Sequence, residues 1–145
     1  MIKNERQYAI TKAQATQFAQ ALEQLSRGRA RGPAAHPLLR KAEADALRSQ
    51  LADLRAELEE YDALRSGRRA VLKMSSLDEL PRALIQARIA SGLSQKELAQ
   101  RLGLKEQQIQ RYEATDYATA SLARLIKIGR ALGLKVRAEA WAEQS

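Results

Sequence analysis

Hydrogen-bonding side chains of three kinds are concentrated in residues 105–111, KEQQIQR. A glutamine carboxamide can pair with adenine, a guanidinium with guanine, and a carboxylate can accept a hydrogen bond from cytosine. The set therefore favours contact with the base edges of a nucleic acid, provided that one element presents the side chains together. The alternative interpretation is a polar helix face that is merely solvated.

The residues around this stretch predict two short helices joined by a tight turn. Ser94 suits the N-cap of a helix from Gln95 to about Leu102, and Gly103 permits the positive φ of a turn. Apolar positions recur through both helices, at Leu98, Leu102, Leu104, Ile109 and Tyr112. The small Ala99 lets the helices approach closely. This pattern predicts a helix-turn-helix.

Two segments, LIQARIASGLSQKELAQRLGLKEQQIQRYE and SLARLIKIGRALGLKV, resemble the lambda-repressor/Cro-like helix-turn-helix family, also called the XRE family. The likeness runs roughly from Leu80 to Val136. The positions that coincide with the family pattern are the Leu-Ser-Gln start, Ala99, Gly103 and Ile109. The resemblance also implies that Arg88 pairs with Glu113 and that this pair fixes the geometry of the motif.

The resemblance implies that the second helix of the motif enters the major groove of DNA, with Ile109 and Tyr112 pointing inward. The expected base-contacting residues are Glu106, Gln107, Gln110 and Arg111. The expected phosphate-contacting residues are Gln95, Lys96 and Lys105. Gln95 heads its helix, where backbone N–H groups and the helix dipole favour an anion.

Two features depart from the family pattern. Lys105 stands where relatives carry a serine or threonine cap, so the second helix is expected to fray or to begin at Leu104. The following loop, Ala114–Ala120, contains Asp116 and no basic residue, whereas many relatives contact phosphates there. We therefore expect modest affinity per subunit and an important role for dimerisation.

The N-terminal part predicts two longer helices. Thr11 can cap the first, and the second runs from about Leu38 to Leu64. A heptad seam lies on the second helix, at Leu47, Leu51, Leu54, Leu58 and Tyr61. These helices form either a hairpin or a coiled coil with a second copy, and we expect the seam to support oligomerisation. The remaining alternative is an amphipathic helix that packs on the second domain.

The expected fold is mainly α: a helical hairpin or coiled coil over residues 1–66, a linker over 67–76, and a four- to five-helix lambda-repressor-like domain over 77–145. Ala70–Met74 fits a short strand, Ser76 and Glu79 fit a capping box, and Gly92 is expected to end a helix from Pro81 to Ala90. Ser121 is expected to cap a further helix, Leu122–Leu132, that ends at Gly133.

After Gly133, apolar and polar residues alternate as far as Trp141, in the order LKVRAEAW. The alternation predicts a short C-terminal edge strand, paired either with residues 71–74 or with its counterpart in a dimer. Continuation of the helix is the other interpretation.

Composition narrows the function further. The formal charge of +8 is uneven, because residues 1–66 hold 11 basic and 9 acidic side chains while residues 67–145 hold 14 and 8. Most of the positive charge therefore lies in residues 67–145, and this favours a polyanionic partner for that part of the chain. There is no cysteine and one histidine, His36, so we expect no metal, no cofactor and no enzyme activity; acidic pairs such as Glu59-Glu60 fit solvated charge. The first residues do not fit a signal peptide, and a cytosolic protein without membrane contact is expected.

The function that these features favour is a dimeric, sequence-specific transcriptional repressor acting on a double-stranded DNA operator. The segment ATDYATASLARLIKIGRALG also resembles small antitoxins of this fold, which implies autoregulation and a toxin protein as a possible partner. A phage or mobile-element regulator and a helical protein-interaction scaffold are the alternatives. The operator, the toxin and any effector stay open.

Overall fold

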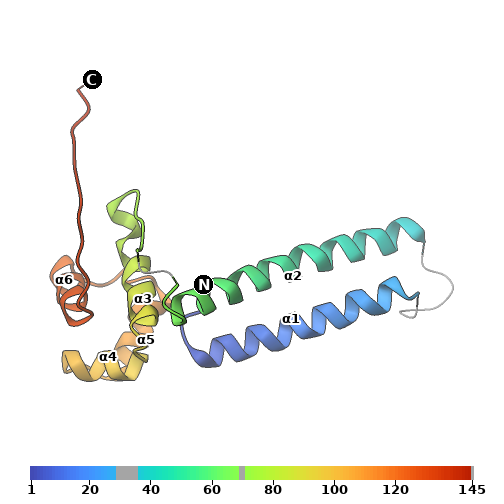
Figure 1. Ribbon diagram of the computed structural model, residues 1–145, viewed down its shortest axis with the longest axis horizontal. Coiled ribbons are helices and arrows are strands. Elements are labelled where there is room, and N and C mark those ends of the chain that lie inside the picture. Colours follow the sequence, from blue (N-terminus) through green and yellow to red (C-terminus); the bar gives the residue numbers. More distant parts are fainter. Residues whose placement is uncertain (29–35, 69–70, 145) are drawn as a thin grey trace. The chain divides into compact units, whose positions relative to one another are not determined.

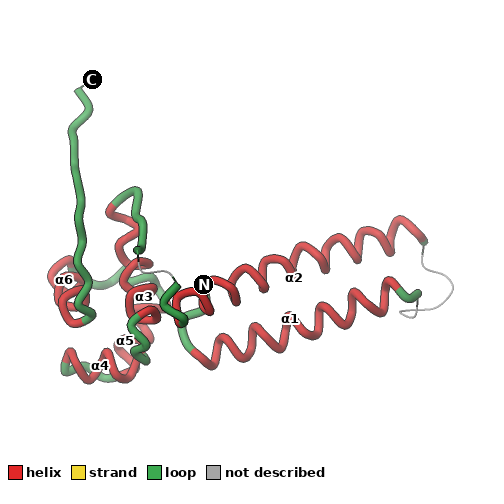
Figure 2. Tube along the Cα trace, viewed as in Figure 1, coloured by secondary structure: helices red, strands yellow, loops and turns green. Residues whose placement is uncertain are grey.

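The computed structural model describes residues 1–28, 36–68 and 71–144, which belong to two units, Met1–Arg68 and Arg69–Ser145. Throughout these residues the regular elements are helices, as Figure 2 shows in red. The predicted mainly α fold is thus confirmed. No helix among them is both long and apolar enough to cross a membrane.

The first unit is a helical hairpin. Its helices are α1, Glu5–Ser26, and α2, Pro37–Arg65, which run side by side in opposite directions (Figure 1). Within the seam, Leu51 and Tyr61 are buried and the other three residues are partly exposed. The Tyr61 ring packs on Tyr8 of α1, with centroids 5.2 Å apart. The hairpin alternative is confirmed, and α1 covers part of the seam within one chain.

Both helices of the hairpin begin at side-chain caps that the sequence analysis did not identify. α1 starts earlier than predicted, because the Asn4 side chain accepts a hydrogen bond from the Gln7 N–H at 2.8 Å. Thr11 is not a cap and lies buried inside α1. His36 has a structural role, since its Nδ1 accepts from the Leu38 N–H at 3.2 Å and Pro37 follows at the first turn of α2.

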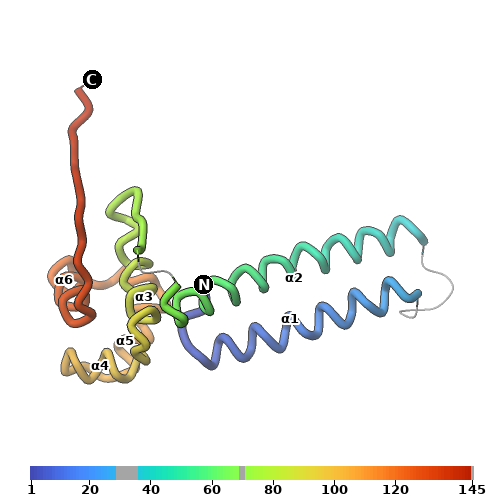
Figure 3. The backbone as a smooth tube through the Cα atoms, viewed as in Figure 1, coloured from blue at the N-terminus to red at the C-terminus, as the bar shows by residue number. Residues whose placement is uncertain are grey.

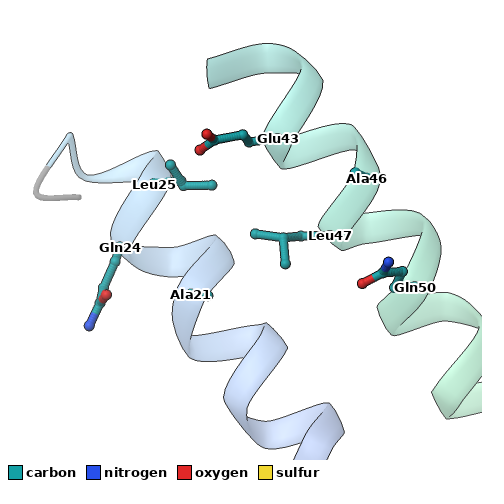
Figure 4. Close-up of a pocket in the computed structure, with 7 residues that line it drawn as sticks. All are labelled: Ala21, Gln24, Leu25, Glu43, Ala46, Leu47 and Gln50. Atoms are coloured by element: carbon teal, nitrogen blue, oxygen red, sulfur yellow. The ribbon is translucent and has the colours of Figure 1, made fainter. Parts of the chain in front are cut away.

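The two helices of the hairpin are held together by polar contacts at one end and are separated by a cleft towards the other. Where α1 begins and α2 ends, the Tyr8 hydroxyl donates to Asp62 at 3.1 Å and Arg65 pairs with Glu5 at 2.8 Å. Towards the other end, a cleft of about 450 Å³ separates the helices, and Leu25 and Leu47 point into it (Figure 4). The cleft is lined by Ala21, Gln24, Leu25, Glu43, Ala46, Leu47 and Gln50.

The second unit packs four α-helices and a 3₁₀ turn around a small apolar core. The elements are η1, Leu77–Glu79; α3, Leu80–Ala90; α4, Gln95–Leu102; α5, Glu106–Ala114; and α6, Leu122–Ala131. α4 contacts α5 and α6, and α3 contacts α6. The core is formed by Leu84, Ile85, Ile89, Leu98, Ile109 and Ile128, each at most 2% exposed. This agrees with the predicted domain of four to five helices.

In this unit the predicted capping box is wrong, and the two predicted strands are not observed. Ser76 does not form a capping box, because its hydroxyl bonds Asp78 and Glu79 instead accepts from the Ser75 N–H at 2.5 Å. Residues 71–74 and 134–144 contain neither strand nor helix, and Ala70 lies outside the described residues. An alternating pattern supplies the faces of a strand, but a ladder also needs a partner, and none is present in the described part of this unit.

Candidate nucleic-acid interface

The turn between α4 and α5 has the left-handed geometry that the sequence predicted. Ser94 Oγ accepts from the Glu97 N–H at 3.1 Å and starts α4. Gly103 ends it with φ 68° and ψ 27°, and the Leu104 N–H donates to the Ala99 carbonyl at 2.9 Å. A Cβ added at Gly103 would meet no atom within 4 Å, so its backbone conformation, and not space, favours glycine.

Gly103→Val is therefore expected to lower the free energy of unfolding of the second unit by about 1–2 kcal/mol, because a β-branched residue is strained at positive φ. Gly103→Asn is the matched control, since asparagine tolerates this conformation better. The measurement is chemical denaturation of both variants. Equal stabilities for valine and asparagine would contradict the turn geometry.

A buried ion pair joins α3 and α5. Arg88 on α3 binds Glu113 on α5 through two hydrogen bonds of 2.6 and 2.8 Å, and the side chains are 3% and 0% exposed. Arg88 also donates to the Leu93 carbonyl at 2.8 Å. The two parallel bonds add directional constraint to the attraction of the charges. The pair that the resemblance implied is formed, and it fixes the end of α5 relative to α3.

Gln95 completes this cluster from α4. Its side chain is 7% exposed, and its Nε2 donates to Glu113 at 2.9 Å. The carboxamide is thus engaged inside the domain and not directed towards a phosphate. A phosphate at the start of α4 would instead meet backbone N–H groups, together with the exposed side chain of Lys96.

The start of α5 is ordered in a way that the sequence analysis missed. α5 begins at Glu106, after Lys105, and the Gln108 side chain accepts from the Lys105 N–H at 3.0 Å. This bond is one of the two hydrogen bonds of a capping box, so the helix neither frays here nor begins at Leu104. The glutamine at the third position of the helix, Gln108, could have indicated this start in the sequence.

The four predicted base-contacting residues all lie exposed on α5, while Ile109 is fully buried beneath them. Gln110 Nε2 donates to Glu106 Oε1 at 3.3 Å. No hydrogen bond within the described residues engages the side chains of Gln107 or Arg111. α5 therefore presents a carboxylate, two carboxamides and a guanidinium from a helix anchored on its inner side.

Tyr117 anchors the loop after α5, and the sequence analysis did not identify it. Asp116 and Tyr117 have φ values of 49° and 58°, a conformation that costs energy in residues other than glycine. The Tyr117 ring stacks on Tyr112 at 5.5 Å and is 3% exposed. Its hydroxyl finds no hydrogen-bond partner among the described residues. Burial, and next the charge of Glu113, raise the pKa of Tyr117 far above its ordinary value.

Tyr117→Phe is expected to raise the free energy of unfolding by about 1 kcal/mol at neutral pH, because it removes a buried unpaired hydroxyl. In the parent protein, the raised pKa of Tyr117 also makes stability depend on pH. Its contribution to the free energy of unfolding is complete below the ordinary pKa of 10.0 and is lost as pH rises above it, because Tyr117 then ionises in the unfolded chain before it does in the folded one. Tyr117→Phe should therefore lose less stability than the parent at alkaline pH. Denaturation at neutral and alkaline pH tests both statements, with Tyr112→Phe as control; a destabilised Tyr117→Phe at neutral pH would contradict them.

Comparison with known families agrees with this geometry. A family model described as Helix-turn-helix matches residues 84–138, which span α3 to the segment after α6. Curated proteins and solved structures give no match. This part of the chain is a lambda-repressor/Cro-like helix-turn-helix, the domain of DNA-binding transcription regulators.

Proposed function

We propose that the protein is a sequence-specific transcriptional repressor that contacts its operator through α5. One observation carries this proposal: the exposed face of α5 presents unengaged Gln107 and Arg111 side chains, while Ile109 and Glu113 hold the same helix in the core. The orientation of α5 is therefore already fixed in the absence of DNA. Lys96 and Lys105 are the proposed phosphate contacts, with the backbone N–H groups at the start of α4.

A binding titration against salt tests this function. DNA fragments selected from a random pool by the purified protein should share a sequence, and affinity should fall steeply as salt rises because bound counterions are released. Selection without a shared sequence, together with a flat salt dependence, would favour the protein-interaction scaffold over a repressor.

We further propose that the active form is a dimer or higher oligomer and that the hairpin of residues 1–66 contributes to it. The hairpin leaves apolar surface on α2, since Leu38 is 71% and Leu39 is 60% exposed and Leu47 borders the cleft. Two linked copies of α5 would bind half-sites about one DNA turn apart, which offsets the lack of basic residues in the loop of residues 114–120. Residues 67–76 would then connect the hairpin to the DNA-binding domain, residues 77–145.

Replacing Leu39 and Leu47 together with lysine is expected to lower the mass measured by light scattering, because charge then occupies the apolar surface between hairpins. Both side chains are partly or fully exposed, so the hairpin should stay folded, whereas a lysine at the buried Leu51 would unfold it. Gln50→Lys adds charge to the same cleft without removing apolar surface and serves as control. An unchanged mass for the double variant would exclude this surface as the contact between copies.

The finer proposal is that the protein is the autoregulating antitoxin of a toxin–antitoxin operon, acting on the nucleoid in the cytoplasm. It is supported by the likeness of residues 114–133 to small antitoxins. Expression of the neighbouring gene should arrest growth, and co-expression of this chain should relieve the arrest. Absence of a toxic neighbour would leave a phage or mobile-element regulator as the better assignment.

A further inference from the structure

The three glutamines of α5 have different hydrogen-bond partners, although the sequence shows them as similar side chains close together. Gln108 Oε1 accepts from the Lys105 N–H at 3.0 Å, so this carboxamide closes the first turn of the helix. Gln110 Nε2 donates to Glu106 Oε1 at 3.3 Å. The Gln107 side chain makes no hydrogen bond within the described residues. These differences decide which of the glutamines can contact a base from α5, the helix that follows α4 in Figure 3.

Adenine is the base that a glutamine pairs with best, and the pairing uses both polar groups of the carboxamide. The oxygen accepts from adenine N6 while the nitrogen donates to adenine N7. Gln108 has its oxygen bound to the helix backbone, and Gln110 has its nitrogen directed at a carboxylate. Gln107 is exposed and has neither group engaged within the described residues. Of the three, Gln107 is therefore the glutamine whose whole carboxamide is available to an adenine.

The Glu106 carboxylate has a different preference. The bond from Gln110 engages one of its oxygens, since residues four apart are neighbours on a helix, and the second oxygen can still accept. An ionised carboxylate only accepts hydrogen bonds. In the major groove, guanine presents acceptors and thymine an acceptor and a methyl group, whereas cytosine presents the N4 donor. Adenine also presents a donor, but its N7 acceptor lies beside it and repels a carboxylate oxygen. Glu106 therefore favours cytosine.

The bond from Gln110 increases the selectivity of Glu106. Immobilising a side chain with many rotamers costs conformational entropy at the moment of binding. Because the Gln110 amide already donates to Glu106, part of this ordering is present in the free protein. A carboxylate that is fixed in one orientation also repels the acceptor edges of wrong bases, since it cannot turn away from them.

We propose that Glu106 contacts a cytosine in each operator half-site, that Gln107 contacts an adenine, and that Gln110 contacts no base but positions the Glu106 carboxylate. This inference rests on the proposed function, since it concerns operator DNA bound through α5. It removes Gln110 from the base-contacting residues that the sequence predicted. Glu106 also acts through repulsion, because a carboxylate near the phosphates weakens binding to DNA that lacks the cytosine.

Titration of the full chain against single-base variants of the selected operator tests the assignment of Glu106. In the parent protein, replacing the cytosine should weaken binding about 5- to 150-fold. Glu106→Gln exchanges the carboxylate for a carboxamide of the same shape, so the preference for cytosine should be lost and adenine should be accepted there. The same variant should bind unrelated DNA more tightly, because a negative charge near the phosphates is removed. An unchanged preference for cytosine in Glu106→Gln would overturn the assignment.

Three further substitutions on the same helix separate the roles of the glutamines, with relative affinities among operator variants as the readout. Gln107→Ala should abolish the preference at one adenine. Gln108→Ala should leave every base preference in place, because its carboxamide bonds the backbone. Gln110→Ala should reduce the discrimination at the cytosine position by roughly 2- to 10-fold and leave the other positions as in the parent. Loss of preference at a different position, or an unchanged cytosine position, would overturn the positioning role of Gln110.

The titrations also distinguish this inference from the proposed function. A selected operator that contains no cytosine dependent on Glu106 would retain the repressor and exclude the assignment of Glu106. If the purified protein selects no shared sequence at all, the repressor and this inference both fail.

Discussion

Arg88→Met is expected to destabilise the second unit by about 3–5 kcal/mol, the largest effect of any single substitution considered for this chain. The Arg88 and Glu113 side chains are almost completely buried and joined by two short hydrogen bonds. Removing the guanidinium leaves a buried carboxylate whose opposite charge is gone, although the Gln95 carboxamide still donates to it, and the Leu93 carbonyl loses a donor as well. An uncompensated buried charge is much more costly than the loss of an exposed pair.

Hydrogen exchange of the α3–α5 amides in the full chain measures this loss, because it reports on the second unit alone. Arg130→Met on α6 is the control: this arginine is exposed, and its replacement should cost less than about 0.5 kcal/mol. The double variant Arg88→Met/Glu113→Leu should be no less stable than Arg88→Met, since both charges are then absent. A loss below about 1 kcal/mol for Arg88→Met would contradict a buried pair at this position.

Arg111→Ala is expected to weaken binding to the selected operator by about 1–3 kcal/mol, roughly 5- to 150-fold, and to relax the preference at one base position. The reason is that the Arg111 side chain is exposed on α5 and unengaged within the described residues, so the substitution removes a base contact without disturbing the core. Titrations on operator and on unrelated DNA measure the effect.

Lys96→Ala is the matched comparison for Arg111→Ala. Lys96 lies at the start of α4 and is a proposed phosphate contact. Its loss should weaken all duplexes about equally and lower the slope of affinity against salt by about one unit. If Arg111→Ala also weakened operator and unrelated DNA equally, Arg111 would be assigned to a phosphate and not to a base.

The part of the fold that was predictable from the sequence depends on short-range signals. Ser94, Gly103 and the apolar spacing around Ile109 act within one or two helical turns, and each lies where the pattern placed it. The start of α1 was mispredicted because two residues, Asn4 and Thr11, can both cap a helix, and only packing shows that Thr11 is buried.

The features that the sequence did not show depend on side-chain packing and on backbone conformation in the folded domain. Gln95 turns inward because Glu113, 18 residues later, offers a buried acceptor. Tyr117 is buried through a stack on Tyr112 and a backbone conformation rare for tyrosine, neither of which composition indicates. The C-terminal alternation predicted a strand, but pairing requires a second strand that the described residues of this unit do not contain.

Guanine methylation interference on the selected operator tests most directly whether α5 contacts bases in the major groove. Methylation at guanine N7 places a group on the major-groove edge, where an arginine would bind. We predict that methylation of one guanine in each half-site blocks binding of the parent protein and has no effect on the residual binding of Arg111→Ala. An interference pattern that is the same for both proteins, or that is confined to the minor-groove face of adenines, would contradict the placement of α5.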